Sequence, residues 1–170
     1  TMAKVQVNNS WECATAPFLP VFGNVDRHIS NLVQAGVQNL MLSWTLGGYI
    51  SDNLRIAASY FFEDTDSNGE NPFDQTLQAN FGKWATAVKT ATNHFCQAFA
   101  EFPFSVVSMY YGPSNTGAGN LLYPQPSGMM ATMTCYPYDH LEKWRTQYPV
   151  EVYREQYHKI CKKWEEGLAL

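Results

Sequence analysis

The chain has 170 residues, a net charge of -4, and 15% charged residues beside 15% aromatic residues. At this length a single domain can bury a core without disulfides or metals. Lysine and arginine form no cluster, so we expect no nucleic-acid partner, because contact with a phosphate backbone needs a basic face. No apolar run approaches the roughly 20 residues of a membrane span, so we expect no membrane partner.

The four cysteines lie far apart in the sequence, at Cys13, Cys96, Cys135 and Cys161. Their spacing matches neither a paired-cysteine motif nor the Cys/His sets that bind zinc. We interpret them as mostly buried free thiols, with a disulfide in a secreted protein as the alternative. The compartment, whether cytoplasmic, periplasmic or extracellular, therefore stays open, and we expect neither a metal nor a cofactor.

Two short apolar segments in the first half are predicted to be parallel strands. They are residues 3–7 and the segment that begins at Leu40, which lies between Gly36 and the pair at 47–48. The second segment is apolar without alternation, which is typical of a strand covered on both faces. The stretch that joins them is predicted to be a helix capped by Asn24, with one apolar stripe formed by Val25, Ile29, Leu32 and Val33.

A second helix is predicted from Ser51, as its N-cap, to about Glu63. Five of its apolar residues are expected to face the interior: Leu54, Ala57, Ala58, Phe61 and Phe62. Residues 1–63 are therefore predicted to form a βαβα unit. The acidic, polar stretch that follows separates this unit from a helical C-terminal region, residues 64–170.

The C-terminal region is predicted to begin with one long amphipathic helix. Apolar residues recur at threes and fours from about residue 73 to residue 102. Residues 104–111 fit either a strand or more helix, and residues 112–148 are predicted to be mostly ordered loop rich in glycine, proline and aromatic residues. A last helix is expected to start at Pro149 and to stop at Gly167. The fold class predicted is α/β, helix-rich, with long loops.

A candidate ligand site lies where the two strands end. The carboxyl ends of parallel strands lie at the same edge of a sheet, so Trp11 and Glu12 after the first strand should share one rim with Trp44 after the second. An indole face and a carboxylate together suit a sugar. A solvated glutamate and a packed tryptophan remain the alternative. Asn120, Asp139 and Trp144 of the aromatic loops are further candidates for substrate binding.

Five segments carry a family resemblance: residues 9–13 (NSWEC), 40–49 (LMLSWTLGGY), 101–104 (EFPF), 120–124 (NLLYP) and 136–139 (YPYD). Together they resemble the C-terminal part of bacterial TIM-barrel glycoside-hydrolase-like proteins. The resemblance implies that the two strands are the seventh and eighth of a barrel. It also implies that Glu12 is a catalytic or sugar-binding carboxylate and that Trp44 stacks on the sugar.

A (β/α)8 barrel takes about 250 residues, so this chain cannot close one. We expect a fragment of a carbohydrate-active enzyme, a glycoside hydrolase that acts on a saccharide and is inactive as this fragment, since glycoside hydrolysis needs a second carboxylate. A non-catalytic carbohydrate-binding module and a purely structural C-terminal domain are the alternatives. Two strands alone leave open edges, so the chain should self-associate or cover its edge with its own loops.

Overall fold

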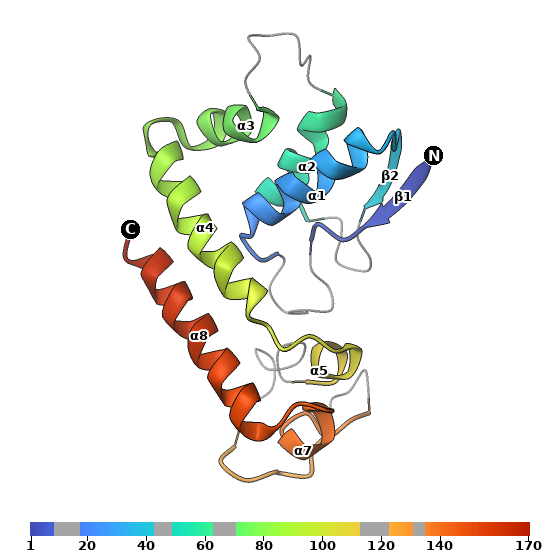
Figure 1. Ribbon diagram of the computed structural model, residues 1–170, viewed down its shortest axis with the longest axis vertical. Coiled ribbons are helices and arrows are strands. Elements are labelled where there is room, and N and C mark those ends of the chain that lie inside the picture. Colours follow the sequence, from blue (N-terminus) through green and yellow to red (C-terminus); the bar gives the residue numbers. More distant parts are fainter. Residues whose placement is uncertain (9–17, 43–48, 63–70, 113–122, 131–134) are drawn as a thin grey trace.

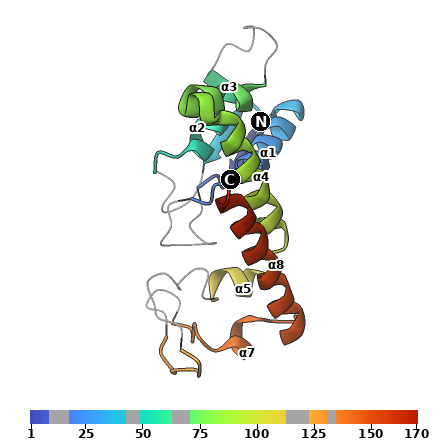
Figure 2. The ribbon, with the colours of Figure 1, turned by 90° about the vertical axis from the view of Figure 1, so that its left-hand side faces the viewer.

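The computed structural model describes residues 1–8, 18–42, 49–62, 71–112, 123–130 and 135–170. These residues form an elongated molecule with an α/β end and an aromatic end (Figure 1). The α/β end holds both strands and the helices α1 to α3, and the aromatic end holds α5 and α7. Two long helices, α4 and α8, lie side by side and connect the two ends (Figure 2).

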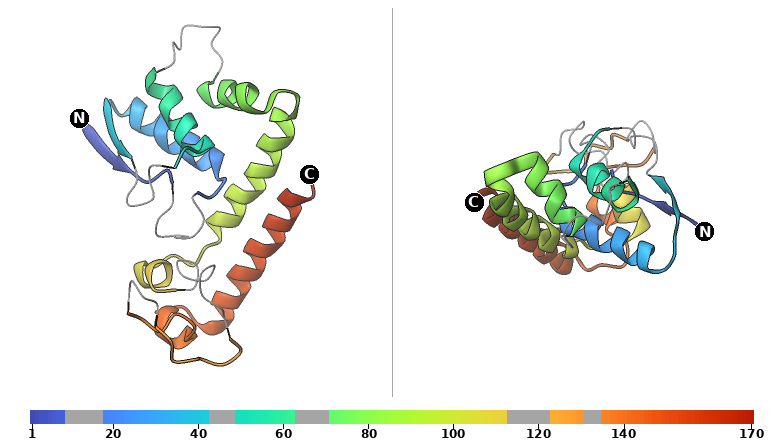
Figure 3. Two further views of the ribbon diagram at one scale, coloured as in Figure 1. Left: turned by 180° about the vertical axis from the view of Figure 1, so that it is seen from behind. Right: turned by 90° about the horizontal axis from the view of Figure 1, so that it is seen from above.

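Strands β1 (Met2–Val5) and β2 (Asn39–Leu42) pair in parallel, with Ala3 opposite Leu40, as the sequence predicts. The prediction that β2 is covered on both faces is wrong, because Met41 is 56% exposed. The helices cover only one face of this two-stranded sheet, with α1 and α2 between the strands and the α4–α8 pair (Figure 3). The expected self-association through the open edge stays a prediction.

Helix α1 (Phe22–Gln34) buries Val25 and Ile29 against the sheet, as its apolar stripe predicts. The predicted stripe is wrong at its end, because Val33 is 37% exposed. It begins before Asn24, so the prediction of Asn24 as its N-cap is wrong. It ends where Gly36 adopts a φ of 78°, a left-handed conformation that favours glycine.

Helix α2 (Asp52–Phe62) begins as predicted, since the Leu54 N–H donates to the Ser51 hydroxyl at 3.1 Å. Its buried side chains include Ile56 and Ala57, but Phe62 is 88% exposed. The expectation that Phe62 faces the interior is therefore wrong. The residue lies at the end of the helix, away from the stripe that packs on α1.

The prediction of a single long helix over residues 73–102 is wrong, because the helix is interrupted near its middle. The chain forms α3 (Pro72–Phe81), a short 3₁₀ turn η1 (Gly82–Trp84) and α4 (Ala85–Ala100). Gly82 has a φ of 53°, which interrupts the helix and turns α3 across the end of α4 (Figure 1). The apolar spacing continues through this turn because both helices pack on the same core.

Helix α8 (Val150–Leu168) packs along α4. The rings of Phe95 and Trp164 stack with centroids 4.3 Å apart. Gly167 does not end the helix, contrary to the prediction. A Cβ atom there would lie 2.6 Å from the Phe95 ring and 2.9 Å from the Ala91 carbonyl oxygen, so glycine permits the close approach of the two helices.

At the aromatic end, residues 104–111 contain a helix, α5 (Val106–Tyr110), rather than a strand. In the described part of the predicted loop region 112–148, the chain forms the short helix α7 (Leu141–Trp144). The described chain is therefore a helix-rich α/β structure with a small parallel sheet, as predicted at that level of detail. Within the described ranges, no helix is long and apolar enough to cross a bilayer.

Candidate functional site

The structure locates two of the six predicted site residues, Asp139 and Trp144. The other four lie outside the described residues: Trp11, Glu12, Trp44 and Asn120.

A polar network nevertheless joins the carboxyl ends of the two strands. Asn8, just after β1, donates from its side-chain nitrogen to the carbonyl oxygen of Tyr49 at 2.6 Å. Its side-chain oxygen accepts a hydrogen bond from the Ser51 hydroxyl at 2.5 Å, and all three groups lie after a strand and before α2. The chain segments that follow the two strands therefore meet at one edge of the sheet. The rim of Trp11, Glu12 and Trp44 itself stays a prediction.

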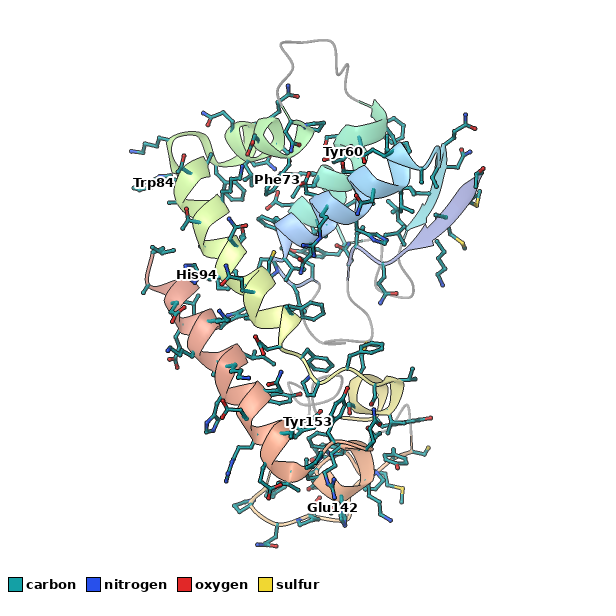
Figure 4. The ribbon with its side chains drawn as sticks, viewed as in Figure 1. Tyr60, Phe73, Trp84, His94, Glu142 and Tyr153 are labelled. Carbon is teal, nitrogen blue, oxygen red and sulfur yellow. The ribbon has the colours of Figure 1, made fainter. Side chains whose placement is uncertain are left out.

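Asp139 and Trp144 line a pocket at the aromatic end, with a volume of about 450 Å³. Three tyrosines and an arginine line the same space, and Tyr153 lies on the side of α8 that faces α5 and α7 (Figure 4). We call this space the aromatic pocket, and its principal residues are Tyr123, Asp139, Trp144, Tyr153, Arg154 and Tyr157.

Trp144 is the last residue of α7, and contacts with Ser108 and Tyr153 fix its position. The Ser108 hydroxyl donates to the Trp144 carbonyl oxygen at 2.9 Å, and the Tyr153 ring meets the indole edge-on with centroids 5.2 Å apart. Gly112 packs beside them, since a Cβ there would lie 2.3 Å from the Ser108 carbonyl oxygen and 3.4 Å from the indole. Trp144 is 8% exposed, and its indole N–H is buried without an acceptor among the described residues. This N–H is a hydrogen-bond donor available to a ligand.

The tyrosines of α8 extend the aromatic surface. Tyr153 and Tyr157 stand one helical turn apart, and their rings stack with centroids 5.1 Å apart. Burial raises the pKa of the Tyr153 phenol, while the hydroxyls of Ser108 and Tyr157 act in the opposite direction. Tyr153 is therefore neutral near pH 7, with an apolar ring face and a hydroxyl tip.

Asp139 supplies the negative charge of the pocket. Its Oδ2 accepts a hydrogen bond from the Ser127 backbone N–H at 2.9 Å. Hydrogen bonds from the side chain and backbone of Ser127 lower the pKa of Asp139, so the carboxylate is ionised near pH 7. Its Oδ1 is buried and accepts no hydrogen bond from the part of the chain that the structure describes. One carboxylate oxygen is thus fixed by the protein, and the other is left as an acceptor.

No family model, no curated protein and no solved structure matches this chain. The likeness to TIM-barrel glycoside-hydrolase-like proteins accordingly stays a prediction.

The described lining of the aromatic pocket holds one carboxylate beside its aromatic rings. Asp139 is the one carboxylate among its described lining residues, and the hydrolysis of a glycosidic bond ordinarily uses two. Arg154, which is exposed, forms no ion pair with any described residue and adds a cationic donor. The pocket therefore offers aromatic faces, one anionic acceptor and two kinds of donor.

The sequence does not identify the three tyrosines of the aromatic pocket or Arg154 as site residues. Tyr153 and Tyr157 fall on one face of the last helix, and this spacing is the same for a core stripe and for a pocket lining. The signal that could have identified them is their position in the first two turns of that helix, close in sequence to Asp139 and Trp144. Tyr123 lies in a loop without periodicity and gave no such signal.

Proposed function

We propose that the chain binds a saccharide in the aromatic pocket. The observation that carries the proposal is that Asp139 and Trp144, which the sequence singles out separately as substrate-binding residues, line the same cavity of about 450 Å³. This volume lies within the range of about 300 to 1,000 Å³ that is typical of small-molecule sites.

The lining chemistry fits a sugar. The C–H faces of a pyranose ring stack on aromatic rings, which Tyr153 and Tyr157 present side by side. The hydroxyls of a sugar are both donors and acceptors. They could donate to Asp139 Oδ1 and accept from the Trp144 indole N–H, which are two of the buried polar atoms without a hydrogen-bond partner among the described residues. Arg154 adds a charged donor at the exposed side.

The test is a titration of the purified chain with a panel of neutral and acidic oligosaccharides, followed by calorimetry. Asp139→Asn and Arg154→Gln should each weaken binding about tenfold, because each removes a charged hydrogen-bonding partner. The matched control is Lys162→Gln, which removes a cation from an exposed position on the same helix. Equal affinities for all three variants, or no binding across the panel, would contradict the proposal.

Hydrolysis of a glycosidic bond is the second candidate function. It rests on the resemblance to TIM-barrel glycoside-hydrolase-like proteins, in which residues 1–63 would form the last βαβα units of a barrel, and on the parallel pairing of β1 with β2. In this proposal Glu12 is catalytic, Trp11, Trp44 and Asn120 hold the sugar, and the fragment is inactive by itself.

Glu12→Gln tests the hydrolytic candidate in the intact parent protein. The substitution should depress turnover strongly and leave the fold unchanged, because it removes a charge while keeping the size of the side chain. Full activity in the variant would exclude Glu12 from catalysis. That outcome would leave saccharide binding in the aromatic pocket as a separate question.

A further inference from the structure

A second cavity of about 370 Å³ lies at the α/β end, between the end of β1, helix α1 and the first turn of α2. We call it the strand-end pocket. It shares no described lining residue with the aromatic pocket. Its lining has three parts that differ in how deeply they are buried. They are a polar atom at the inner end, apolar walls and a polar mouth.

The inner polar atom belongs to Asn53, whose side chain is almost fully enclosed at 1% exposure. Its nitrogen donates to the carbonyl oxygens of Val7 at 2.9 Å and Leu19 at 2.8 Å. These two carbonyls accept hydrogen bonds only from the amide nitrogen, so they fix the orientation of the side chain. Its Oδ1 is buried and has no hydrogen-bond partner. A buried acceptor of this kind is expected to have a donor, from water or from a ligand.

The walls are mostly aliphatic, with one aromatic residue, Phe99 of α4. Val7, Val25 and Ile29 are all buried, and they contribute side chains from β1's continuation and from the inner face of α1. Such walls favour a ligand whose middle part is apolar, because contact removes apolar surface from water.

The mouth is cationic. Arg27 and His28 are exposed residues of α1 at the edge of the pocket, and the described lining contains no carboxylate. The neighbouring acid on α1, Asp26, is engaged elsewhere, since it accepts a hydrogen bond from the Tyr60 hydroxyl. Arg27 donates one hydrogen bond, to Asn24 Oδ1 at 3.0 Å. An anionic group at the mouth would therefore meet a guanidinium without a competing carboxylate from the described lining residues.

We propose that the strand-end pocket binds a short aliphatic carboxylate that carries a hydroxyl at its far end. The hydroxyl donates to Asn53 Oδ1, the methylene chain lies against the valine and isoleucine walls, and the carboxylate meets Arg27 at the mouth. This site is independent of the saccharide proposal, because the two pockets are built from different residues.

Three probes of matched length separate these contributions: ω-hydroxyhexanoate, hexanoate and the hexanediol with a hydroxyl at each end. The first carries both end groups, the second lacks the inner donor, and the third lacks the anion. Heteronuclear NMR titration of the full chain should give a dissociation constant for ω-hydroxyhexanoate at least about fivefold below those of the other two. Equal affinity for hexanoate would overturn the assignment to Asn53, and no shift of resonances from α1 with any probe would overturn the site.

Variants at the mouth avoid the buried core and the structural hydrogen bonds of Asn53. Asn31→Trp, at an exposed lining position of α1, should block the pocket and abolish the shifts. Gln34→Trp is its control, on the same helix but outside the lining. Arg27→Gln should raise the dissociation constant of ω-hydroxyhexanoate about tenfold and leave that of the hexanediol unchanged, whereas Arg55→Gln should change neither. If Arg27→Gln affected both probes equally, the charge would have no role and the proposal would be wrong.

Discussion

The two ends of the molecule are stabilised by different kinds of core. At the α/β end the most deeply buried apolar side chains are aliphatic, among them Ile29, Ile56 and Leu77, each 1% exposed or less. At the aromatic end the buried apolar side chains are those of Tyr138, Trp144 and Tyr153, and each carries a polar atom. An aliphatic core needs only shape complementarity, whereas an aromatic core with polar tips must also satisfy hydrogen bonds.

The polar atoms of its core explain why the aromatic end holds the candidate saccharide pocket. Hydroxyls and carbonyls hold the backbone there, as in the Ser108 bond to Trp144 and the Tyr148 hydroxyl bond to the Phe104 carbonyl oxygen at 2.6 Å. The paired helices α4 and α8 pack along each other and connect these loops to the α/β end. The remaining buried polar atoms of Asp139 and Trp144 are then free to select a ligand.

The largest expected effect tests the support between the two ends. Phe95 is 7% exposed and stacks on Trp164, so Phe95→Ala should lower the free energy of unfolding by about 3–5 kcal/mol. Phe99→Ala should cost less, because Phe99 is only half-buried. Urea denaturation followed by circular dichroism measures both changes. An unchanged midpoint for Phe95→Ala would show that the α4–α8 contact does not stabilise the fold.

Gly167→Ala tests the same contact by crowding it. The added methyl group would lie 2.6 Å from the Phe95 ring, so the helices must move apart, at a cost of about 1–3 kcal/mol. Leu168→Ala is the control, since Leu168 is 71% exposed and its loss should change stability by less than about 0.5 kcal/mol. Thermal unfolding of the two variants compares them. Equal melting temperatures would contradict the close approach.

At the α/β end, Ser51→Ala should lower stability by about 1 kcal/mol, because Ser51 caps α2 and also bonds Asn8. Thr90→Ala is a matched control on α4, where the exposed hydroxyl bonds only to its own helix. Hydrogen exchange should locate the loss in α2 and β1 and leave the amides of α7 unchanged. A loss spread evenly over both ends would mean that the ends unfold as one unit.

The sequence predicts the α/β end better than the aromatic end, for a physical reason. Val25 and Ile29 repeat with the helical period, and Ser51 caps its helix locally, so neighbours in sequence determine those elements. The break at Gly82 depends on one backbone conformation that apolar spacing does not reveal.

The aromatic pocket depends on contacts between segments far apart in sequence. Ser108 bonds Trp144 across 36 positions, and no local pattern signals such a contact. Asp139 and Trp144 are predicted from residue type alone, and the tyrosines of α8 give no separate signal, because a core stripe and a pocket lining share one helical period.

The smallest effect concerns the charge of Asp139, on which the saccharide proposal depends. Hydrogen bonds from Ser127 hold its pKa in the native state below the usual value of 3.8. A carboxyl group with a depressed native pKa stabilises the fold above its unfolded pKa, and this contribution is lost as the pH falls through the native pKa. Saccharide affinity should therefore be constant between about pH 5 and 8 as far as Asp139 is concerned.

NMR of the side-chain carboxyl carbons measures the titration directly. The Asp139 midpoint should lie below 3.8, and Ser127→Ala should move it upward, because the variant removes the hydroxyl that contributes most to the shift. Glu142 is an internal control, since its pKa is lowered by Arg145 rather than by Ser127 and should not respond. A native midpoint at or above 3.8 would mean that Ser127 does not hold the carboxylate. Asp139 would then lack the fixed orientation that leaves its Oδ1 as the acceptor for a sugar hydroxyl.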